Sequence, residues 1–232
     1  MDNPLFPFGI APPMGIGTLG ERSLHASIKE WYRRPGDLLE EKVDGYVIDI
    51  VRGEHLIEIQ TGNFAGFRRK LAYLLREHQV HVVHPIAVER IVVREGGGAR
   101  RSPKRGTVYD VFEELVAIPH QLMEPNFTLE VLLVREELVL RNDGRGSWRR
   151  RGWSLGDRRL LSVEGSVTFG LLRDYKALIP STLKQPFTAA ELAKSVPCNI
   201  GLAQRMVYVL RHIGAIRKAG KRGRAQTYEV EE

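Results

Sequence analysis

Apolar residues in the first 80 positions repeat with two different periods. A spacing of three and four positions in 20–34, and again in 64–79, predicts two amphipathic helices, the first ended by a proline and a glycine. Between them, 43–52 and 55–61 are rich in β-branched residues and are joined by a short glycine-containing turn, which predicts a strand hairpin. We expect the second helix to pack its apolar face on that hairpin.

The pattern continues with further strands and helices along the chain. Two short strands, a helix and a longer strand or pair of strands are predicted at 80–86, 89–95, 107–122 and 127–141. A glycine-rich basic stretch between the second strand and the helix predicts a loop. We therefore expect an α/β protein.

Composition divides the chain into four parts. The first 17 residues are apolar but broken by proline and glycine, so we expect an irregular N-terminal arm, 1–17, rather than a signal peptide. The periodic region that follows predicts an α/β core over 18–141. Glycine, tryptophan and arginine without a periodic apolar face predict a basic linker or interface over 142–166, and helical patterns return in a C-terminal domain, 167–232.

Charge and cysteine content narrow the classes of partner. The 232 residues carry a formal net charge of +7, which favours a polyanionic partner. The chain lacks the run of about 18 apolar residues that a membrane-spanning helix requires, so we expect no membrane partner. A single cysteine, Cys198, excludes an intramolecular disulfide framework and a multi-cysteine zinc site, and it fits a cytoplasmic location.

Two carboxylates occupy the expected hairpin. Asp49 lies on its first strand and Glu58 on its second, where facing residues have Cβ atoms about 4.5 to 5.5 Å apart. Two acids at that distance repel each other unless a cation lies between them. Alternation puts Glu58 and Gln60 on one face of the strand and Ile59 on the other. The pattern favours a magnesium site, because Mg²⁺ needs only a few oxygen ligands beside its waters; the competing interpretation is a turn residue and a solvated strand face.

At these residues the chain resembles the restriction-endonuclease-like superfamily. Its motif is an acidic residue on one strand followed by Glu-x-Lys on the next, which Asp49, Glu58 and Gln60 match except for the lysine. The resemblance extends over roughly 18–140 and implies a mixed sheet flanked by helices. It also implies a further glutamate on the preceding helix, matched by Glu21, and a metal ligand in the main-chain carbonyl of Ile59.

The superfamily's lysine orients or deprotonates the attacking water, and Gln60 stands in its place. Lys70, ten positions later on the flank of the next helix, is our candidate for a replacement ammonium. The predicted catalytic residues are therefore Glu21, Asp49, Glu58, Gln60 and Lys70, and the predicted ligands of Mg²⁺ (or Mn²⁺) are Asp49, Glu58, Ile59 and Glu21.

The C-terminal pattern is helix, turn, helix and hairpin. Thr188 and Glu191 form a capping box at the start of the first helix. Residues 167–232 resemble the winged-helix family of DNA-binding domains, which implies a recognition helix and a basic wing. The predicted nucleic-acid-binding side chains on these two elements are Gln204, Arg205, Tyr208, Arg211, Lys218, Lys221, Arg222 and Arg224.

Two other groups of residues invite interpretation. His78, His81 and His84 have no regular ligand spacing, so paired or solvated histidines are favoured over a metal cluster. The basic runs Arg100–Arg105 and Arg149–Arg151, the latter beside Trp148 and Trp153, are each either solvated loops or phosphate-binding surfaces.

These observations lead to one main prediction and one alternative. The main prediction is a metal-dependent DNA endonuclease with a restriction-endonuclease-like core and a winged helix, for which a homodimer would supply the two sites of a double-strand break. The alternative, motivated by Gln60, is a catalytically inactive nuclease-like DNA-binding or regulatory protein. An RNA-processing or defence nuclease is a third hypothesis, because the residues of the core do not indicate which nucleic acid is the substrate.

Overall fold

The computed structural model describes residues 24–144 and 152–231. The predicted arm, the candidate acid Glu21, and Trp148 with the basic run Arg149–Arg151 lie outside the described residues.

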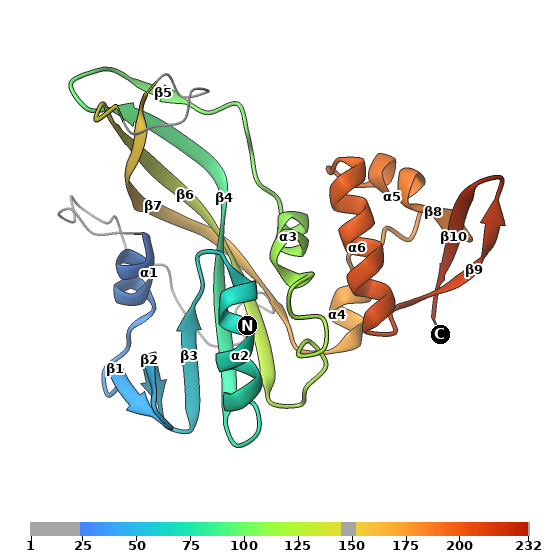
Figure 1. The fold of residues 1–232 in the computed structure, drawn as a ribbon, viewed down its shortest axis with the longest axis horizontal. Helices are drawn as coiled ribbons and strands as arrows, with labels where there is room; N and C mark the ends of the chain where they lie inside the picture. Colours follow the sequence, from blue (N-terminus) through green and yellow to red (C-terminus); the bar gives the residue numbers. More distant parts are fainter. Residues whose placement is uncertain (1–23, 145–151, 232) are drawn as a thin grey trace, which may run out of the picture.

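A mixed sheet forms the centre of the molecule (Figure 1). Its strands follow the order β1-β2-β3-β4-β6-β7, with β5 beside β4. Strands β3, β4 and β6 are parallel to one another, and the other pairings are antiparallel. The strands are β1 (Leu38–Val43), β2 (Tyr46–Arg52), β3 (His55–Ile59), β4 (Gln79–Arg94), β5 (Ala99–Arg101), β6 (Phe127–Arg141) and β7 (Ser154–Phe169).

Helices cover both faces of this sheet, so the predicted α/β class, a large mixed sheet flanked by helices, is confirmed. Helix α1 (Leu24–Tyr32) buries Leu24 and Ile28 in one apolar cluster, which also contains Ile57 and Ile59 of β3. Helix α2 (Phe64–Leu74) lies over the other face and buries its predicted apolar stripe in a second cluster. The two clusters show that β3 separates two cores.

The central strands are longer than the pattern predicted. The two expected strands over 80–95 form one continuous strand, β4, and the expected strand or pair of strands over 127–141 is the single strand β6. Beyond the helices these strands continue as an extension that is visible at the upper left of Figure 1. The extension accounts for the second half of both strands.

The expected linker over 142–166 differs most from the structure. Ser154–Phe169 forms β7, which pairs with β6 along its length. Cross-strand ion pairs explain a strand without apolar alternation: Arg158 bonds Glu136 at 2.6 Å, and Arg159 lies 3.3 Å from Glu137. Acidic partners on β6 thus complement the arginines that made this segment look like a loop.

Two smaller predictions also need correction. The expected helix over 107–122 is limited to the 3-10 turn η1 (Val108–Val111) and the one-turn helix α3 (Phe112–Leu115). The expected basic loop contains the three-residue strand β5, which pairs with the end of β4.

The C-terminal region consists of three helices and a small antiparallel sheet of order β8-β10-β9. Its elements are α4 (Leu172–Lys176), β8 (Phe187–Thr188), α5 (Ala189–Ser195), α6 (Ile200–His212), β9 (Ile216–Arg222) and β10 (Ala225–Val230). The predicted capping box is present, since Thr188 and Glu191 exchange hydrogen bonds at the start of α5. Helix α6 contacts α3, and one apolar cluster continues from the α2 face of the sheet into this region.

Candidate functional site

Asp49 and Glu58 meet where β2 and β3 diverge. The main-chain ladder pairs Ile50 with Ile57, which places Asp49 next to Glu58 at the following position. There the side chain of Asp49 continues the hydrogen bonding, because its Oδ2 accepts the N–H of Ile59 at 2.9 Å. The N–H of Asp49 in turn donates to the Glu58 carboxylate. The two predicted acids are therefore adjacent.

Lys70 reaches Glu58 from helix α2. Its Nζ lies 2.6 Å from Oε1 of Glu58 and 2.5 Å from the carbonyl oxygen of Val47. Glu58 faces α2 because Ile57 and Ile59 occupy the opposite face of β3. The structure thus brings together Asp49, Glu58 and the candidate replacement lysine.

The electrostatics of the two acids differ. Burial raises the pKa of Glu58 to about 7; the hydrogen bond and charge of Lys70 act against this rise, and the negative charge of Asp49 adds to it. Burial also disfavours the charged form of Asp49, but hydrogen bonds from His25 and from the Ile59 N–H outweigh it and lower the pKa of Asp49. One lysine is not enough to offset the burial of Glu58.

His25 on α1 is a site residue that was not predicted from the sequence. Its Nε2 lies 3.1 Å from Oδ2 of Asp49, on the side of the sheet opposite Lys70. A signal existed in the sequence, because His25 is four positions after Glu21 and so would share a helix face with it. The carboxylate of Asp49 is therefore positioned by both α1 and β3.

Gln60 is fixed by its main chain just after β3. Its N–H donates to the carbonyl of Val83 at 2.9 Å, and its own carbonyl lies 2.6 Å from Nδ1 of His84. Burial lowers the pKa of His84, so this imidazole is neutral near pH 7 and Nδ1 carries the donated hydrogen. The side chain of Gln60 is half-buried, and the residue comes directly after Ile59, the last residue of β3.

The donors at this site suit a magnesium ion. Asp49 and Glu58 contribute carboxylate oxygens, and one or two carboxylates are what such sites use beside waters and substrate phosphate. The carbonyl of Ile59 is directed toward β2, because its N–H bonds Asp49 and both groups of a strand residue point to the same side. Over 24–144 and 152–231, no group of three or more His, Cys, Asp or Glu is arranged to hold a metal.

The predicted recognition helix, α6, exposes the residues expected of it. Gln204, Arg205, Tyr208 and Arg211 are exposed, while the expected core residues Leu202, Met206, Val209 and Leu210 are buried. Arg205 lies 3.9 Å from Glu113 of α3. A shallow groove lined by Val116 of the core and by the exposed face of α6 therefore runs between the two parts of the molecule.

The hairpin of β9 and β10 carries the predicted basic tip. Lys218, Lys221 and Arg224 are exposed. Arg222 differs from them, because its guanidinium bonds Glu191 at 2.5 Å and the carbonyl of Pro186 at 2.8 Å. Three of the four basic residues are thus presented outward, and Arg222 ties the hairpin to α5.

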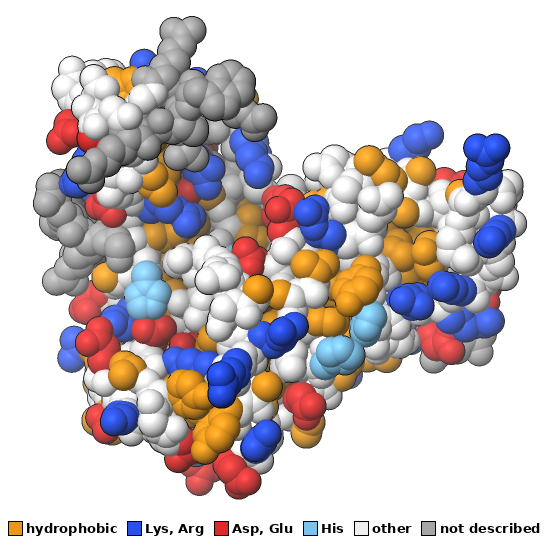
Figure 2. Space-filling view, in the orientation of Figure 1, with side chains coloured by type: hydrophobic (Ala, Val, Ile, Leu, Met, Phe, Trp, Pro, Cys, Tyr) orange, Lys and Arg blue, Asp and Glu red, His pale blue; other side chains and the backbone are white. Residues whose placement is uncertain are grey.

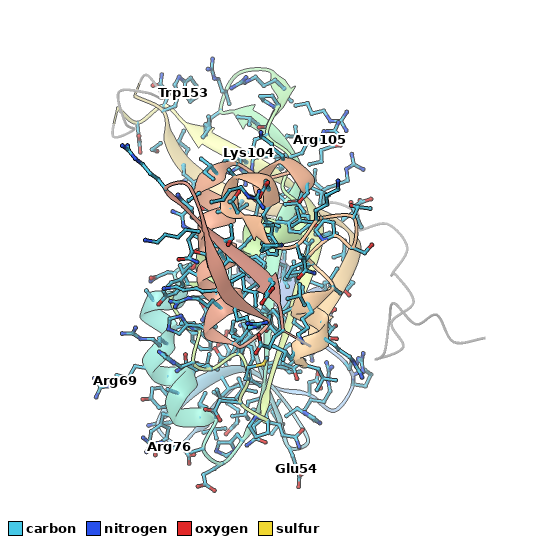
Figure 3. The ribbon with its side chains drawn as sticks, turned by 90° about the vertical axis from the view of Figure 1, so that its right-hand side faces the viewer. Glu54, Arg69, Arg76, Lys104, Arg105 and Trp153 are labelled. Atoms are coloured by element: carbon cyan, nitrogen blue, oxygen red, sulfur yellow. The ribbon has the colours of Figure 1, made fainter. Side chains whose placement is uncertain are left out.

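Further basic side chains lie on the sheet extension and on α2. Figure 2 shows Lys and Arg side chains spread over the core and the C-terminal hairpin, with a notch between extension and C-terminal region. In Figure 3, Arg69 and Arg76 project toward the side to which the hairpin tip also reaches, while Lys104 and Arg105 lie at the top. Arg94 stacks over the ring of Trp153 at 5.2 Å. Basic side chains therefore lie on the sheet extension, on α2 and on the C-terminal hairpin.

Each of the three histidines that were considered as a metal cluster contacts another group of the protein. His78 pairs with Asp44 at 2.8 Å, and His81 lies 3.1 Å from Glu130. His84 bonds Gln60 as described above.

Comparison with known proteins places this chain in a family. A family model described as "Domain of unknown function (DUF8091)" matches residues 22–170. The chain belongs to the DUF8091 family. The matched DUF8091 segment runs from α1 to the end of β7, so it contains Asp49, Glu58 and Lys70, and it ends before the C-terminal helices and hairpin.

The chain is also similar to a protein of Treponema pallidum (strain Nichols), named "Uncharacterized protein". The two are 28% identical over 228 residues, which cover 94% of this chain and 88% of the relative. The similarity therefore includes the C-terminal region beyond the DUF8091 segment. No solved structure matches the chain. In the described ranges, no helix is long and apolar enough to span a membrane.

Proposed function

We propose that this DUF8091 protein is a metal-dependent DNA endonuclease. The observation that carries the proposal is the contact of Lys70 with Glu58 beside Asp49. It supplies two acids and an ammonium at one point, although the lysine of the Glu-x-Lys motif is absent from position 60.

The order of elements supports a restriction-endonuclease-like core. Helix α1 precedes three antiparallel strands, β1 to β3, and α2 then crosses over to β4, which is parallel to β3. The acids lie on β2 and β3, as the superfamily's motif requires. The chain therefore resembles the superfamily both in the order of its elements and in the position of its acidic residues.

The site residues have separable roles in phosphodiester hydrolysis. Asp49, Glu58 and the Ile59 carbonyl would hold magnesium, which when bound supplies Lewis-acid stabilisation of the phosphate charge. Lys70 and the Gln60 amide would orient the water whose oxygen bonds to phosphorus while the bond to the leaving oxygen breaks. The proton of that water passes through solvent to the leaving oxygen. Glu21 remains a candidate ligand from the sequence.

The C-terminal region supports DNA as the polymer. The succession α4, β8, α5, α6, β9 and β10, with the sheet order β8-β10-β9, resembles a winged helix. Its exposed α6 face and basic hairpin tip would serve as recognition helix and wing.

The first experiment tests cleavage directly. Asp49→Asn and Glu58→Gln should each lower magnesium-dependent cleavage of plasmid DNA at least about 1,000-fold, because each removes a charged ligand. Binding of DNA, measured by fluorescence anisotropy, should remain within about threefold. Glu54→Gln is the matched control, since Glu54 is exposed at the turn between β2 and β3 and projects from the bottom of Figure 3.

Two outcomes would reject this assignment. Unchanged cleavage in both variants would place the chemistry elsewhere. The second outcome is that the unaltered protein cleaves no duplex, branched or single-stranded DNA or RNA with magnesium or manganese. The alternative function would then stand: a catalytically inactive nuclease-like DNA-binding or regulatory protein, which Gln60 favours.

A second experiment tests the wing. Replacing Lys221 and Arg224 together by alanine should weaken DNA binding and reduce the slope of log K against log salt by about 2, since each phosphate contact contributes about 0.9. Lys42→Ala is the control for a lost surface charge, because Lys42 is exposed on β1. An unchanged slope would show that the hairpin does not contact phosphates.

A further inference from the structure

The ammonium of Lys70 is held by groups of three different elements. Its Nζ lies 2.6 Å from Oε1 of Glu58 on β3 and 2.5 Å from the carbonyl oxygen of Val47 on β2. The ring of Phe67, one turn earlier on α2, has its centre 6.0 Å from the same nitrogen, a distance at which a ring face attracts a cation. The contact between Lys70 and Glu58 is therefore built into the site and is not a chance meeting of surface charges.

Lys70 uses oxygen atoms that the proposed magnesium site also needs. A hard divalent cation takes carboxylate and carbonyl oxygens as ligands at about 2.0 to 2.1 Å. An ion bound to Oε1 of Glu58 would lie less than about 5 Å from Nζ, because Nζ is itself 2.6 Å from that oxygen. The ammonium and the ion would thus share one carboxylate.

The charges of the site disfavour this sharing. With both acids ionised, Asp49, Glu58 and Lys70 together carry one net negative charge, so the site attracts a further cation. A divalent ion would reverse the sign of that sum while Lys70 stays, whereas the two acids and the ion without Lys70 are neutral together. Because Glu58 is buried, water screens the repulsion between the two cations poorly. The ion and the ammonium therefore oppose each other.

Lys70 can leave Glu58 without a rearrangement of α2. Its side chain is partly exposed, and its four-carbon stem allows Nζ to turn toward solvent. The carbonyl of Val47 remains as an acceptor for one hydrogen of the ammonium. Displacement from Glu58 thus leaves the ammonium solvated and still attached to β2.

We propose that Lys70 competes with a divalent cation for Glu58: its ammonium holds the carboxylate until the ion displaces it, so that Lys70 sets the metal concentration at which the site is filled. The inference rests on the metal site of the proposed function and adds the regulation of that site. It predicts that the unaltered protein binds the ion more weakly than the same site with a neutral side chain at position 70.

Binding of Mn²⁺ to the full chain tests the competition without any measurement of cleavage. Mn²⁺ suits the same oxygen ligands as Mg²⁺, and electron paramagnetic resonance follows the loss of the free-ion signal as it binds. Lys70→Met removes the ammonium. Lys70→Gln removes the charge but keeps an amide that can hydrogen-bond Glu58, which protects the fold. The control is Arg69→Met, which removes the same charge from an exposed side chain at the adjacent position.

Both Lys70 variants should bind one Mn²⁺ per chain at least tenfold more tightly than the unaltered protein. Arg69→Met should change the affinity by less than about twofold, because its charge is exposed and screened. Adding Glu58→Gln to Lys70→Met should abolish the gain, since the contested carboxylate is then absent.

Two results would overturn the inference. Unchanged or weaker Mn²⁺ binding in both Lys70 variants, absence of binding included, would show that the ammonium does not oppose the ion. A gain that persists in the variant that also carries Glu58→Gln would place the ion away from this carboxylate. The nuclease is judged separately: tighter binding in both variants, with no cleavage by the unaltered protein, would reject the nuclease and support the competition.

Discussion

Two ion pairs of this molecule have side chains that are similarly inaccessible to solvent, yet the pKa of the acid is lowered in one pair and raised in the other. Lys70 with Glu58 and Arg52 with Asp37 each join a cation whose side chain is 20% or 24% exposed to an acid that is 3% or 2% exposed. The pKa of Asp37 is lowered, mainly by the hydrogen bonds from Arg52, whereas burial raises the pKa of Glu58 to about 7.

The difference comes first from the cost of burying the Glu58 charge, and then from the number of donors and from the neighbouring charges. Asp37 accepts two N–H groups of Arg52 and the N–H of Arg34, and it lies in the loop after α1. Glu58 lies on the central strand β3, pairs with a single ammonium and has Asp49 beside it. A fully bonded acid stabilises the fold, while an acid in excess of its cations is suited to bind one more cation.

Among the tests of this comparison, the largest effect is expected at Lys70, the one cation among the described residues that pairs with Glu58. Lys70→Met should lower cleavage about 100-fold, because a positioned proton donor or water-orienting group contributes roughly that much. Gln60→Lys in the same chain should restore part of the activity by returning the ammonium to the motif position. Initial rates of plasmid nicking measure both.

Arg69→Met is the matched control, because Arg69 is the neighbouring exposed cation on α2. A loss in Arg69→Met equal to that in Lys70→Met would mean that the rate depends on the general charge of α2. No rescue by Gln60→Lys would argue that the two positions are not equivalent.

A smaller effect is expected in the contribution of each ion pair to the free energy of unfolding. Asp37→Asn should lower the free energy of unfolding by about 2 kcal/mol, since it removes charge-assisted hydrogen bonds from Arg52. Glu58→Gln should cost less than about 1 kcal/mol, because it also removes the burial of a charge beside Asp49. Urea unfolding at pH 7 in a chelator measures both, and equal losses would contradict the comparison.

The smallest effect is the pH dependence of the Asp37 contribution. Its pKa in the folded protein is below the reference value of 3.8, so folding favours the ionised form. The stabilisation is complete above about pH 4 to 5 and is lost as the pH falls through the lowered pKa. The difference in unfolding free energy between the unaltered protein and Asp37→Asn should therefore shrink below pH 4; a constant difference down to pH 2 would show that the Asp37 charge is not involved.

Several parts of this site could be predicted from sequence because they depend on neighbours along the chain. Alternation and the turn between the strands place Asp49 beside Glu58, and helical spacing puts Lys70 on the flank of α2. His25 was not predicted, although its spacing from Glu21 was a signal in the sequence. The segment of β7 resembles a linker in sequence because arginines interrupt its apolar alternation.

The sequence alone determined the helices α1, α2 and α6, the acidic hairpin and the exposed face of α6, since these follow from the local geometry of strands and helices. Tertiary structure decided which charges meet. The antiparallel partner β6 turned an arginine-rich segment into a strand, and α2 and β3 together gave Glu58 one ammonium in a buried position. Burial and pairing depend on segments far apart in the chain, so the raised pKa of Glu58 is a property of the folded protein.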